Sequence, residues 1–392
     1  MKAIDQRWPW HLAMALLMEL LLVGTISAQA QDGGFKKVAV GFAGPLGDSM
    51  VSSARDGAEL AIAEANLRSF RLTGMNAPIQ FVLTAQDDKS DVNIAGFAAQ
   101  YFVRSQVVGV IGHWSTATAM AVAATYEQNF IPQLMFTASG APYTRKGYQT
   151  TFRVPASSDR TAYYLAESAV NVLKAYRIAV IGNDSPFSRS LSEAFVQQLK
   201  ERPVKIVYQS TVSSNTSDFN APLKAVVENQ ADLIFFSANA TQAAAFVQTA
   251  KRLKATAGLL LTGGAVNQAF TVGAERFSVY TLEPDAALDQ CRGWKSFQQR
   301  YQTKFSRPPT SFSRYAYNAT NVLIDAIRQA DSLDGKKITA ALHRYRFNGL
   351  SGEIAFDQQG NAVNYFYTLY QSAATGWRPL KEFSSGHPSV CK

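Results

Sequence analysis

Apolar segments of strand length alternate with helical patterns along the chain from Lys37 onward. Most of these segments are continuously apolar, as expected for strands that are covered on both faces. The candidate strands are 38–42, 79–84, 107–111, 134–137, 178–181, 204–208, 233–236, 259–261 and 278–282. The repeated strand and helix rhythm predicts an α/β protein with parallel sheets and helices on both faces of each sheet.

Small and apolar residues spaced by three and four predict the helices between these strands. Two such faces are Ala54, Ala58, Ala61, Ala65 and Tyr315, Ala319, Val322, Ala326. Near the C-terminus, two long helical segments cover 290–305 and 312–330. The tail then changes character, and its alternating pattern predicts a β-hairpin of 352–356 and 363–370 around the turn "DQQGN".

The chain of 392 residues exceeds what one hydrophobic core usually organises. Pro155 and the serines of "RVPASSDR" break the rhythm before a new series of strands and helices begins. Further helices and strands follow this second series. We therefore expect the chain to return to the first domain and to form two lobes from discontinuous segments. We place 35–154 and 284–348 in the first lobe, and 155–283 and 349–392 in the second.

The N-terminus has the features of an export signal. Lys2 and Arg7 precede the apolar stretch 12–26, which leads into the A-x-A cleavage pattern that ends at Ala30. We therefore expect a signal peptide over 1–30 and a periplasmic mature protein. No later run approaches the roughly 20 apolar residues that a membrane span needs.

Composition and charge narrow the class of partner. The formal net charge is +9, but no Lys/Arg run with interleaved aromatics is present, so we do not expect nucleic-acid binding. A solvated basic surface is the simpler explanation of the charge. The two cysteines, Cys291 and Cys391, are far apart in sequence, and whether they form a disulfide stays open.

Sequence motifs of enzymes are absent. The chain has no G-x-S-x-G, no H-E-x-x-H, no phosphate-binding loop and no Cys/His cluster with zinc spacing, while "TGGAVN" lacks the dinucleotide-binding spacing. We expect no catalytic residue, metal or cofactor, although a hydrolase with a non-local triad stays open. His113 is expected to be a satisfied loop residue, and Asp87 and Asp88 to stabilise their loop and cap the following helix.

The stretch "GHWSTATAMA", 112–121, directly follows an apolar strand. Glycine and small hydroxyl residues are typical of a turn and a helix cap. The first turn of such a helix also offers unpaired N–H groups to an anionic or carbonyl ligand. The stretch alone does not decide between a structural cap and a binding loop.

Several motifs together resemble one family. "KVAVGFAGPLGD", "DGAELAIAEAN", "AQDDKSD", "GVIGHWSTATA", "FTASGAPYTRKGYQTTFRV" and "IAVIGNDSPF" occur in the order found in the periplasmic leucine/isoleucine/valine-binding proteins. These are the solute-binding subunits of ABC importers. The resemblance implies a type I periplasmic binding protein fold, in which two doubly wound parallel-sheet lobes are joined by three crossovers and hold the ligand between them.

The resemblance also implies the partners of the chain. We expect a monomer that binds a small-molecule solute and delivers it to an inner-membrane ABC permease. The alternative is a ligand-sensing module of the same fold that serves a signalling or regulatory partner. Gene neighbourhood separates these two functions. Neighbouring permease and ATPase genes support transport, whereas a neighbouring kinase gene supports sensing.

The resemblance assigns candidate ligand contacts to both lobes. The loops that would hold a ligand carboxylate contain Trp114, Ser115, Thr116 and Ala138, Ser139, Gly140, with Gly140 in place of the family's threonine. Phe187, Asn239 and Met50 occupy the family's other contact positions. We expect Trp114 and Phe187 to enclose the apolar part of the ligand, although both residues are also typical of core packing.

One departure from the family concerns the ligand's ammonium group. The family's amine-binding acid falls near Gly263 or Gly264, and no acid is present there. A buried ammonium without a counter-charge is costly. Glu283 or Asp285 is the candidate replacement. Branched-chain amino acids are therefore one expected ligand class, and amides, aromatic acids or other amine-free carboxylates are the alternative.

Overall fold

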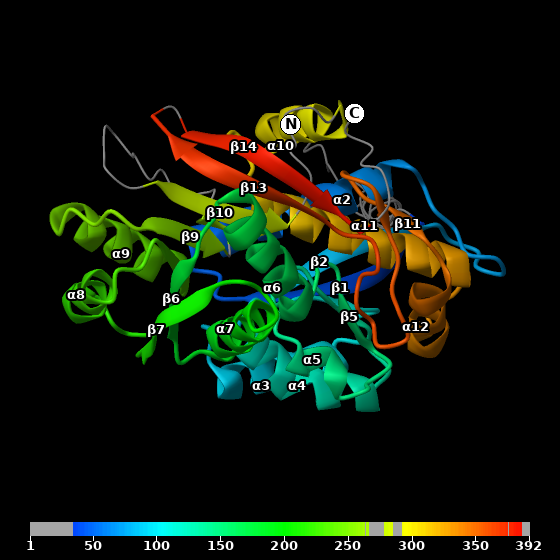
Figure 1. Ribbon diagram of the computed structural model, residues 1–392. Helices are drawn as coiled ribbons and strands as arrows, with labels where there is room; N and C mark the ends of the chain where they lie inside the picture. Colours follow the sequence, from blue (N-terminus) through cyan, green and yellow to red (C-terminus); the bar gives the residue numbers. More distant parts are fainter. Residues whose placement is uncertain (1–33, 263, 266–277, 285–291, 375, 386–392) are drawn as a thin grey trace, which may run out of the picture.

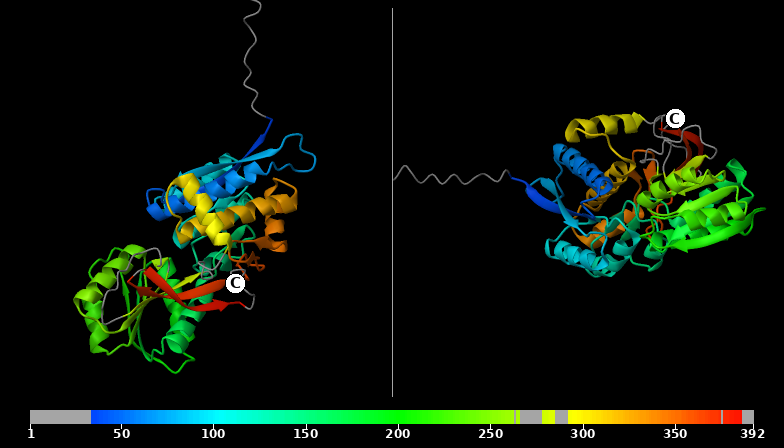
Figure 2. Two further views of the ribbon diagram at one scale, coloured as in Figure 1. Left: turned by 90° about the horizontal axis from the view of Figure 1, so that it is seen from above. Right: turned by 90° about the vertical axis from the view of Figure 1, so that its left-hand side faces the viewer.

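The described part of the chain contains two large β-sheets, each covered by helices, and one small two-stranded sheet. The computed structural model describes residues 34–262, 264–265, 278–284, 292–374 and 376–385. A five-stranded sheet has the order β2-β1-β3-β4-β5, and a seven-stranded sheet has the order β14-β13-β10-β9-β8-β6-β7. The left view of Figure 2 shows the two sheets in separate bodies, which we call the first and second lobe.

The first lobe is built on parallel strands. Its strands are β1 (Lys36–Gly44), β2 (Ile79–Asp87), β3 (Val110–Ile111), β4 (Gln133–Met135) and β5 (Thr151–Arg153). Its helices are α2 (Ser49–Leu67), α3 (Val92–Arg104), α4 (Thr116–Gln128), α5 (Pro142–Arg145), α10 (Arg292–Phe305), α11 (Ser311–Ala330) and α12 (Gly335–Arg344). As Figure 1 shows, α2 and α11 lie on one face of the sheet and α3 and α4 on the other.

The second lobe combines parallel strands with an antiparallel pair at one edge. Its strands are β6 (Arg177–Asn183), β7 (Lys205–Val212), β8 (Leu233–Ser237), β9 (Gly258–Thr262), β10 (Val279–Pro284), β13 (Phe366–Ala373) and β14 (Gly376–Ser384). Its helices are α6 (Ser158–Glu167), a π-helical turn η1 (Ser168–Val172), α7 (Pro186–Leu199), α8 (Asn220–Glu228) and α9 (Ala240–Arg252).

The chain passes between the sheets three times, after β5, after β10 and before β13. This confirms the predicted fold class of two parallel-sheet lobes. One expected boundary is wrong, because 349–362 lies on the first lobe. There β11 (Phe347–Asn348) pairs with β12 (Glu353–Ile354), and Asn361 forms a bridge with Arg153. Ile354 belongs to the core of the first lobe, so burial of its side chain holds this segment there.

The predicted C-terminal hairpin is also displaced. Residues 353–354 pair with the preceding segment 347–348 and not with 363–370. Strand β13 pairs with β14 on one side and with β10 on the other. A single bridge between Phe356 and Ala362 remains across the expected turn. Alternation of polar and apolar residues identified the strand correctly but could not identify its partner, because pairing depends on which sheet edge is open.

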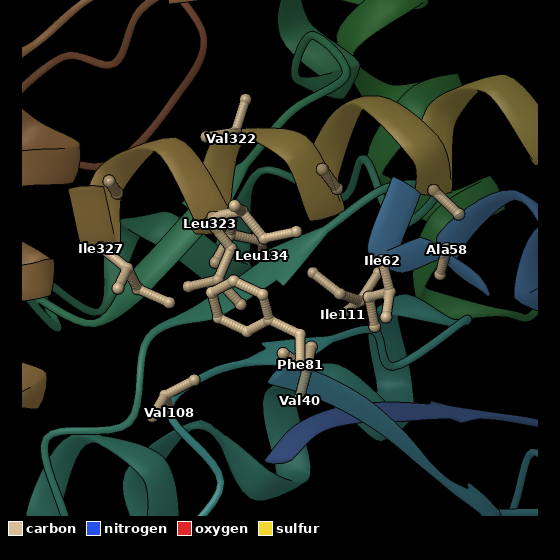
Figure 3. Packing of buried hydrophobic residues seen from close by; sticks show 14 of the residues in the cluster. Val40, Ala58, Ile62, Phe81, Val108, Ile111, Leu134, Val322, Leu323 and Ile327 are labelled. Carbon is tan, nitrogen blue, oxygen red and sulfur yellow. The ribbon is translucent and has the colours of Figure 1, made fainter. Parts of the chain in front are cut away.

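The main core of the first lobe lies between its sheet and the pair α2 and α11. Val40, Ile111 and Leu134 from three strands pack against Ile62 of α2 and Leu323 of α11, as Figure 3 shows. The strands are continuously apolar because a second cluster, around Phe102 and Tyr126 of α3 and α4, covers the opposite face. Helix α11, which completes the first core, therefore follows most of the second lobe in the sequence.

Helices α2 and α11 lie in close contact at Gly57 of the "DGAEL" motif. A Cβ atom at Gly57 would lie 2.0 Å from the carbonyl oxygen of Ser313. Because this neighbour is backbone, it cannot move aside as a flexible side chain would. Gly57 is therefore required by the close contact of the two helices.

We expect Gly57→Ala to destabilise the protein by about 1–3 kcal/mol, the usual cost of overpacking, although alanine is the better helix former. Gly96→Ala in α3 is the matched control, because no atom lies within 4 Å of its added Cβ. The control should gain up to about 1 kcal/mol from helix propensity. Denaturant unfolding of both variants checks this, and equal effects would contradict the assigned helix contact.

Candidate ligand-binding site

Two predicted binding loops of the first lobe lie against each other at the carboxyl ends of β3 and β4. The Thr137 hydroxyl donates to the carbonyl oxygen of Trp114 at 2.6 Å. The Gly140 N–H donates to the hydroxyl oxygen of Thr116 at 3.2 Å. Loops 112–116 and 136–141 thus form one surface, as expected for neighbouring parallel strands.

The first turn of α4 has both a cap and open N–H groups. Ser115 is the N-cap residue, and its hydroxyl oxygen accepts from the Thr118 N–H at 3.1 Å. Within the described ranges, nothing accepts from the N–H groups of Thr116 and Ala117. The two interpretations of this stretch are therefore compatible, because a capped helix still presents two N–H donors and the positive end of its dipole.

Gly140 and Thr116 complement each other in shape. A Cβ atom at Gly140 would lie 2.5 Å from Cγ2 of Thr116, so the threonine that the resemblance implies at this position would require the Thr116 side chain to move. The Gly140 N–H is already used by Thr116, which is buried. In the described part of the chain, the N–H groups of Ala138 and Ser139 have no acceptor, and they are the remaining donors of this loop.

Trp114 belongs to an aromatic cluster that two distant segments share. Its ring centroid lies 4.8 Å from Phe312 of α11 and 5.9 Å from Phe136 after β4. Phe136 stacks in turn on Phe42 of β1. The indole is only partly buried, so the core holds one part of the ring while another part is exposed to solvent.

His113 is buried and satisfied, which confirms the expectation for this residue. Its Nδ1 lies 2.7 Å from Oδ2 of Asp88, and its Nε2 lies 2.9 Å from the hydroxyl of Tyr126. Burial raises the pKa of Tyr126 well above its usual value. The expected helix cap is wrong, because Asp91 and not Asp87 or Asp88 accepts from the first N–H groups of α3.

The remaining predicted contacts lie at helix starts in both lobes. Met50 is in the first turn of α2, half-buried. Phe187 is in the first turn of α7 and packs partly on the core of the second lobe. Asn239 is exposed and caps α9 by accepting from the Gln242 N–H at 2.8 Å. Gln242 also accepts from the Asn183 amide at 2.7 Å, which links the loops after β6 and β8.

Glu283 places a carboxylate at the end of β9. The residue is 4% exposed, and its Oε2 accepts from the Gly264 N–H at 3.0 Å while its Oε1 accepts from the Thr281 hydroxyl at 2.6 Å. A carboxylate from β10 therefore reaches the position where the sequence lacks an acid. Gly263 and Asp285 lie outside the described residues, and so do Cys291 and Cys391.

Direct contacts join the two lobes near these loops. Helices α4 and α7, which carry Thr116 and Phe187 in their first turns, touch each other. Ser158 at the start of α6 donates its N–H to the carbonyl oxygen of Ser139 at 2.7 Å, and it shares a hydroxyl hydrogen bond of 2.7 Å with Ser190 of α7. The candidate loops of the two lobes are therefore on the same side of the molecule.

Sequence reasoning missed three residues of this region. Phe312 lies in a predicted helix but gave no sign that it reaches Trp114. Ser158 and Arg153 belong to the stretch that marked the crossover, and both are fully buried. A charged residue between the end of a strand and a proline was the only available signal, and it does not distinguish a buried arginine from an exposed one.

Within the described ranges, no helix is long and apolar enough to cross a membrane. The same residues contain no group of three His, Cys, Asp or Glu side chains close enough to bind a metal ion. The arrangement as a whole defines a class: two α/β lobes, three crossovers, and helix N-termini from both lobes directed to one region are typical of bilobal solute-binding proteins.

The sequence profile of the periplasmic binding protein family matches residues 38–376, and the chain belongs to this family. The "Leu/Ile/Val-binding protein homolog 1" of Brucella abortus is 23% identical over 321 residues, which cover 80% of this chain and 84% of the relative. The leucine-, isoleucine-, valine-, threonine- and alanine-binding protein of Pseudomonas aeruginosa is 22% identical over 319 residues, covering 81% and 84%. The resemblance to Leu/Ile/Val-binding proteins is thereby confirmed.

Solved structures agree in fold. A leucine-binding protein from Thermotoga maritima gives a TM-score of 0.77 at 22% identity and covers 88% of this chain and 98% of its own. A solute-binding protein of an ABC transporter from Rhodopseudomonas palustris, in complex with 3,4-dihydroxybenzoic acid, gives 0.77 at 17% identity, covering 89% and 98%. Proteins of this one fold thus bind different carboxylates.

We expect His113→Ala to lower the free energy of unfolding by about 3–5 kcal/mol, because it leaves the buried Asp88 carboxylate without its partner. Asp88→Ala should also destabilise, and the double variant should lose less than the sum of the two. Denaturant unfolding of all three variants measures this coupling. Strictly additive losses would show that the Asp88–His113 contact does not stabilise the fold.

Proposed function

We propose that the protein captures a small solute with a carboxylate or carbonyl end between its lobes and delivers it to an inner-membrane ABC importer from the periplasm, after cleavage of its signal peptide. The observation that carries this proposal is the pair of open N–H groups in the first turn of α4, next to the N–H groups of Ala138 and Ser139. Such N–H groups, at the positive end of a helix, favour an anionic or carbonyl oxygen.

Binding works by lobe closure. The three crossovers act as hinges, and a ligand that contacts loops of both lobes binds the closed form more tightly than the open form. The closed population then rises by the ratio of the two affinities. In this scheme Thr116, Ala138 and Ser139 hold the anionic end, and Asn239 contributes a hydrogen bond from the second lobe.

Aromatic side chains enclose the apolar part of the solute. The exposed part of Trp114, backed by Phe312, and the half-buried Phe187 are available for this role. A flat aromatic acid can stack on the indole, and a branched aliphatic side chain can pack on it equally well. Relatives that bind leucine and relatives that bind hydroxybenzoic acids both have the same fold, so both classes are candidates.

Glu283 favours the amino-acid class. Its carboxylate stands at the Gly264 N–H, at the edge of the second sheet from which the loops of Phe187 and Asn239 also leave. An ammonium group bound there would have a counter-charge. Glu283 would then replace the family's amine-binding acid, which is missing near Gly264. We therefore propose branched-chain amino acids as the first candidate ligands and amine-free aromatic carboxylates as the second.

The proposed role is binding without catalysis. His113, the one histidine in the candidate loops, has both ring nitrogens engaged inside the protein. A general base needs a free nitrogen within reach of the substrate. Recovery of the bound compound unchanged after incubation is the corresponding check.

Leucine, isoleucine, 4-methylpentanoate and 4-hydroxybenzoate should be tested in a thermal-shift assay. A ligand that binds only the folded state raises the free energy of unfolding by mass action, by about 2.7 kcal/mol at a ligand concentration of 100 times Kd. Tm rises accordingly. We expect at least one of these carboxylates to raise Tm and Trp114→Ala to abolish the shift. Phe130→Ala, which removes an exposed aromatic at the end of α4, is the matched control and should retain the shift.

A Trp114→Ala variant that melts cooperatively and keeps the full ligand-induced shift would remove this residue from the site. No shift with any of the four compounds, nor with a wider set of amides and aromatic acids, would contradict the proposed function.

We expect Glu283→Gln to weaken leucine binding by about tenfold or more, because a charge-assisted hydrogen bond is lost, while binding of 4-methylpentanoate is unchanged. Glutamine retains an oxygen that can accept from the Gly264 N–H, so the local fold is preserved. Calorimetric titration of both ligands measures the difference. If the wild type already binds 4-methylpentanoate at least as tightly as leucine, Glu283 does not bind an ammonium group.

A further inference from the structure

Arg153, the last residue of β5, is a buried cation without a carboxylate partner. Its side chain is fully buried, and among the described residues no Asp or Glu lies within ion-pair distance of it. Its Nε and Nη1 have no hydrogen-bond acceptor in the same part of the chain. Burying a charge in this way costs several kcal/mol, which makes the placement of this guanidinium notable.

The guanidinium lies directly behind the second binding loop. Its Nη2 donates to the carbonyl oxygen of Gly140 at 2.7 Å and to the hydroxyl of Thr144 at 3.4 Å. Its centre lies 5.9 Å from the ring centroid of Tyr143. The positive charge therefore contacts the same loop that contains the N–H donors of Ala138 and Ser139.

Arg153 also ties this loop to the hinges. Its backbone N–H donates to the Gly360 carbonyl at 2.7 Å, and its carbonyl accepts from the Ala362 N–H at 3.1 Å. These two residues belong to the third connection between the lobes, and the first connection begins directly after Arg153. The backbone of Arg153 is thus held by the third connection at the point where the first connection begins, and its guanidinium is held by Gly140 and Thr144.

The charge persists at neutral pH. Burial lowers the pKa of Arg153 to about 10, against the opposing effect of Tyr143 and of Asp159, Tyr367 and Asp357 farther away. Neither acid neutralises it: Asp159 pairs with Arg145, and Asp357 accepts from N–H groups of its own turn. The loop therefore lies beside a buried positive charge that no carboxylate in the described part of the chain pairs with.

We propose that Arg153 determines the preference of the site for a ligand with a negatively charged end. It acts through the loop that it holds, because its charge favours an anion and its bond to the Gly140 carbonyl reduces the negative potential of that oxygen. This inference rests on the proposed function, since it assumes that loop 138–140 receives the ligand. Arg153 is accordingly a positioning and charge-supplying residue that need not touch the ligand.

The test compares each carboxylate with its neutral-ended amide, using leucine with leucinamide and 4-hydroxybenzoate with 4-hydroxybenzamide. We expect the wild type to bind the carboxylate of a pair more tightly. Arg153→Met should reduce the ratio of the two affinities about tenfold or more, because the unit charge is lost. Arg153→Lys should retain most of the ratio. Arg160→Met removes an exposed arginine from the first turn of α6, close to the same loops, and should leave the ratio unchanged.

The ratio distinguishes a charge effect from a purely structural role. Equal loss of carboxylate and amide binding in Arg153→Met would show that the residue only supports the loop, and this would overturn the inference. A wild type that binds amides as tightly as carboxylates would overturn it even if the variants do not fold. If the wild type binds no member of either pair, the comparison is made with another carboxylate that raises Tm and its amide. If no carboxylate, amide or aromatic acid of the wider set binds, the proposed function fails together with the inference.

Discussion

The packing of α11 against α2 and the first sheet is the contact on which the rest of the structure depends. Of the helices that precede β6, α2 covers only part of one face of the first sheet, and α11 completes this layer. The chain therefore passes back to the first lobe after it has formed most of the second sheet. That return creates the second crossover, and the antiparallel strands β13 and β14 require the third. Three connections restrict the relative motion of the lobes far more than one would.

The same helix connects the core to the binding region. Phe312, in its first turn, packs on Trp114, and the Tyr315 hydroxyl donates to the Pro284 carbonyl at the second crossover. The first lobe thus presents its aromatic surface from two segments that are far apart in sequence. Trp114 is thereby linked, through Phe312, to the helix that follows the second crossover.

Sequence patterns predicted the architecture well because it depends on burial. Continuous apolar strands and small residues at helical spacing follow directly from two-sided coverage, and they identified β1, β6 and α11 with small errors at the ends. Strand partners and segment boundaries were less predictable: 349–362 lies on the first lobe because Ile354 finds space in its core. Loops with helix caps were recognisable, but the buried contacts of Arg153 and Phe312 depend on tertiary approach, which leaves no local pattern.

The proposed binding region combines backbone donors of the first lobe with side chains of the second lobe. Backbone N–H groups at the start of α4 and in loop 138–140, with the charge of Arg153 behind them, suit any carboxylate and do not depend on the remainder of the ligand. Phe187 and Glu283 lie on α7 and β10 of the second lobe, so their side chains can differ without altering these donors. Trp114 directly precedes the N-cap of α4, and its carbonyl oxygen accepts from Thr137. Gly140 illustrates the limit of such change, because its absent side chain is compensated by Thr116, which occupies the space. Under the proposed function, a change of the Phe187 or Glu283 side chain would alter the preferred ligand and would leave the backbone donors in place.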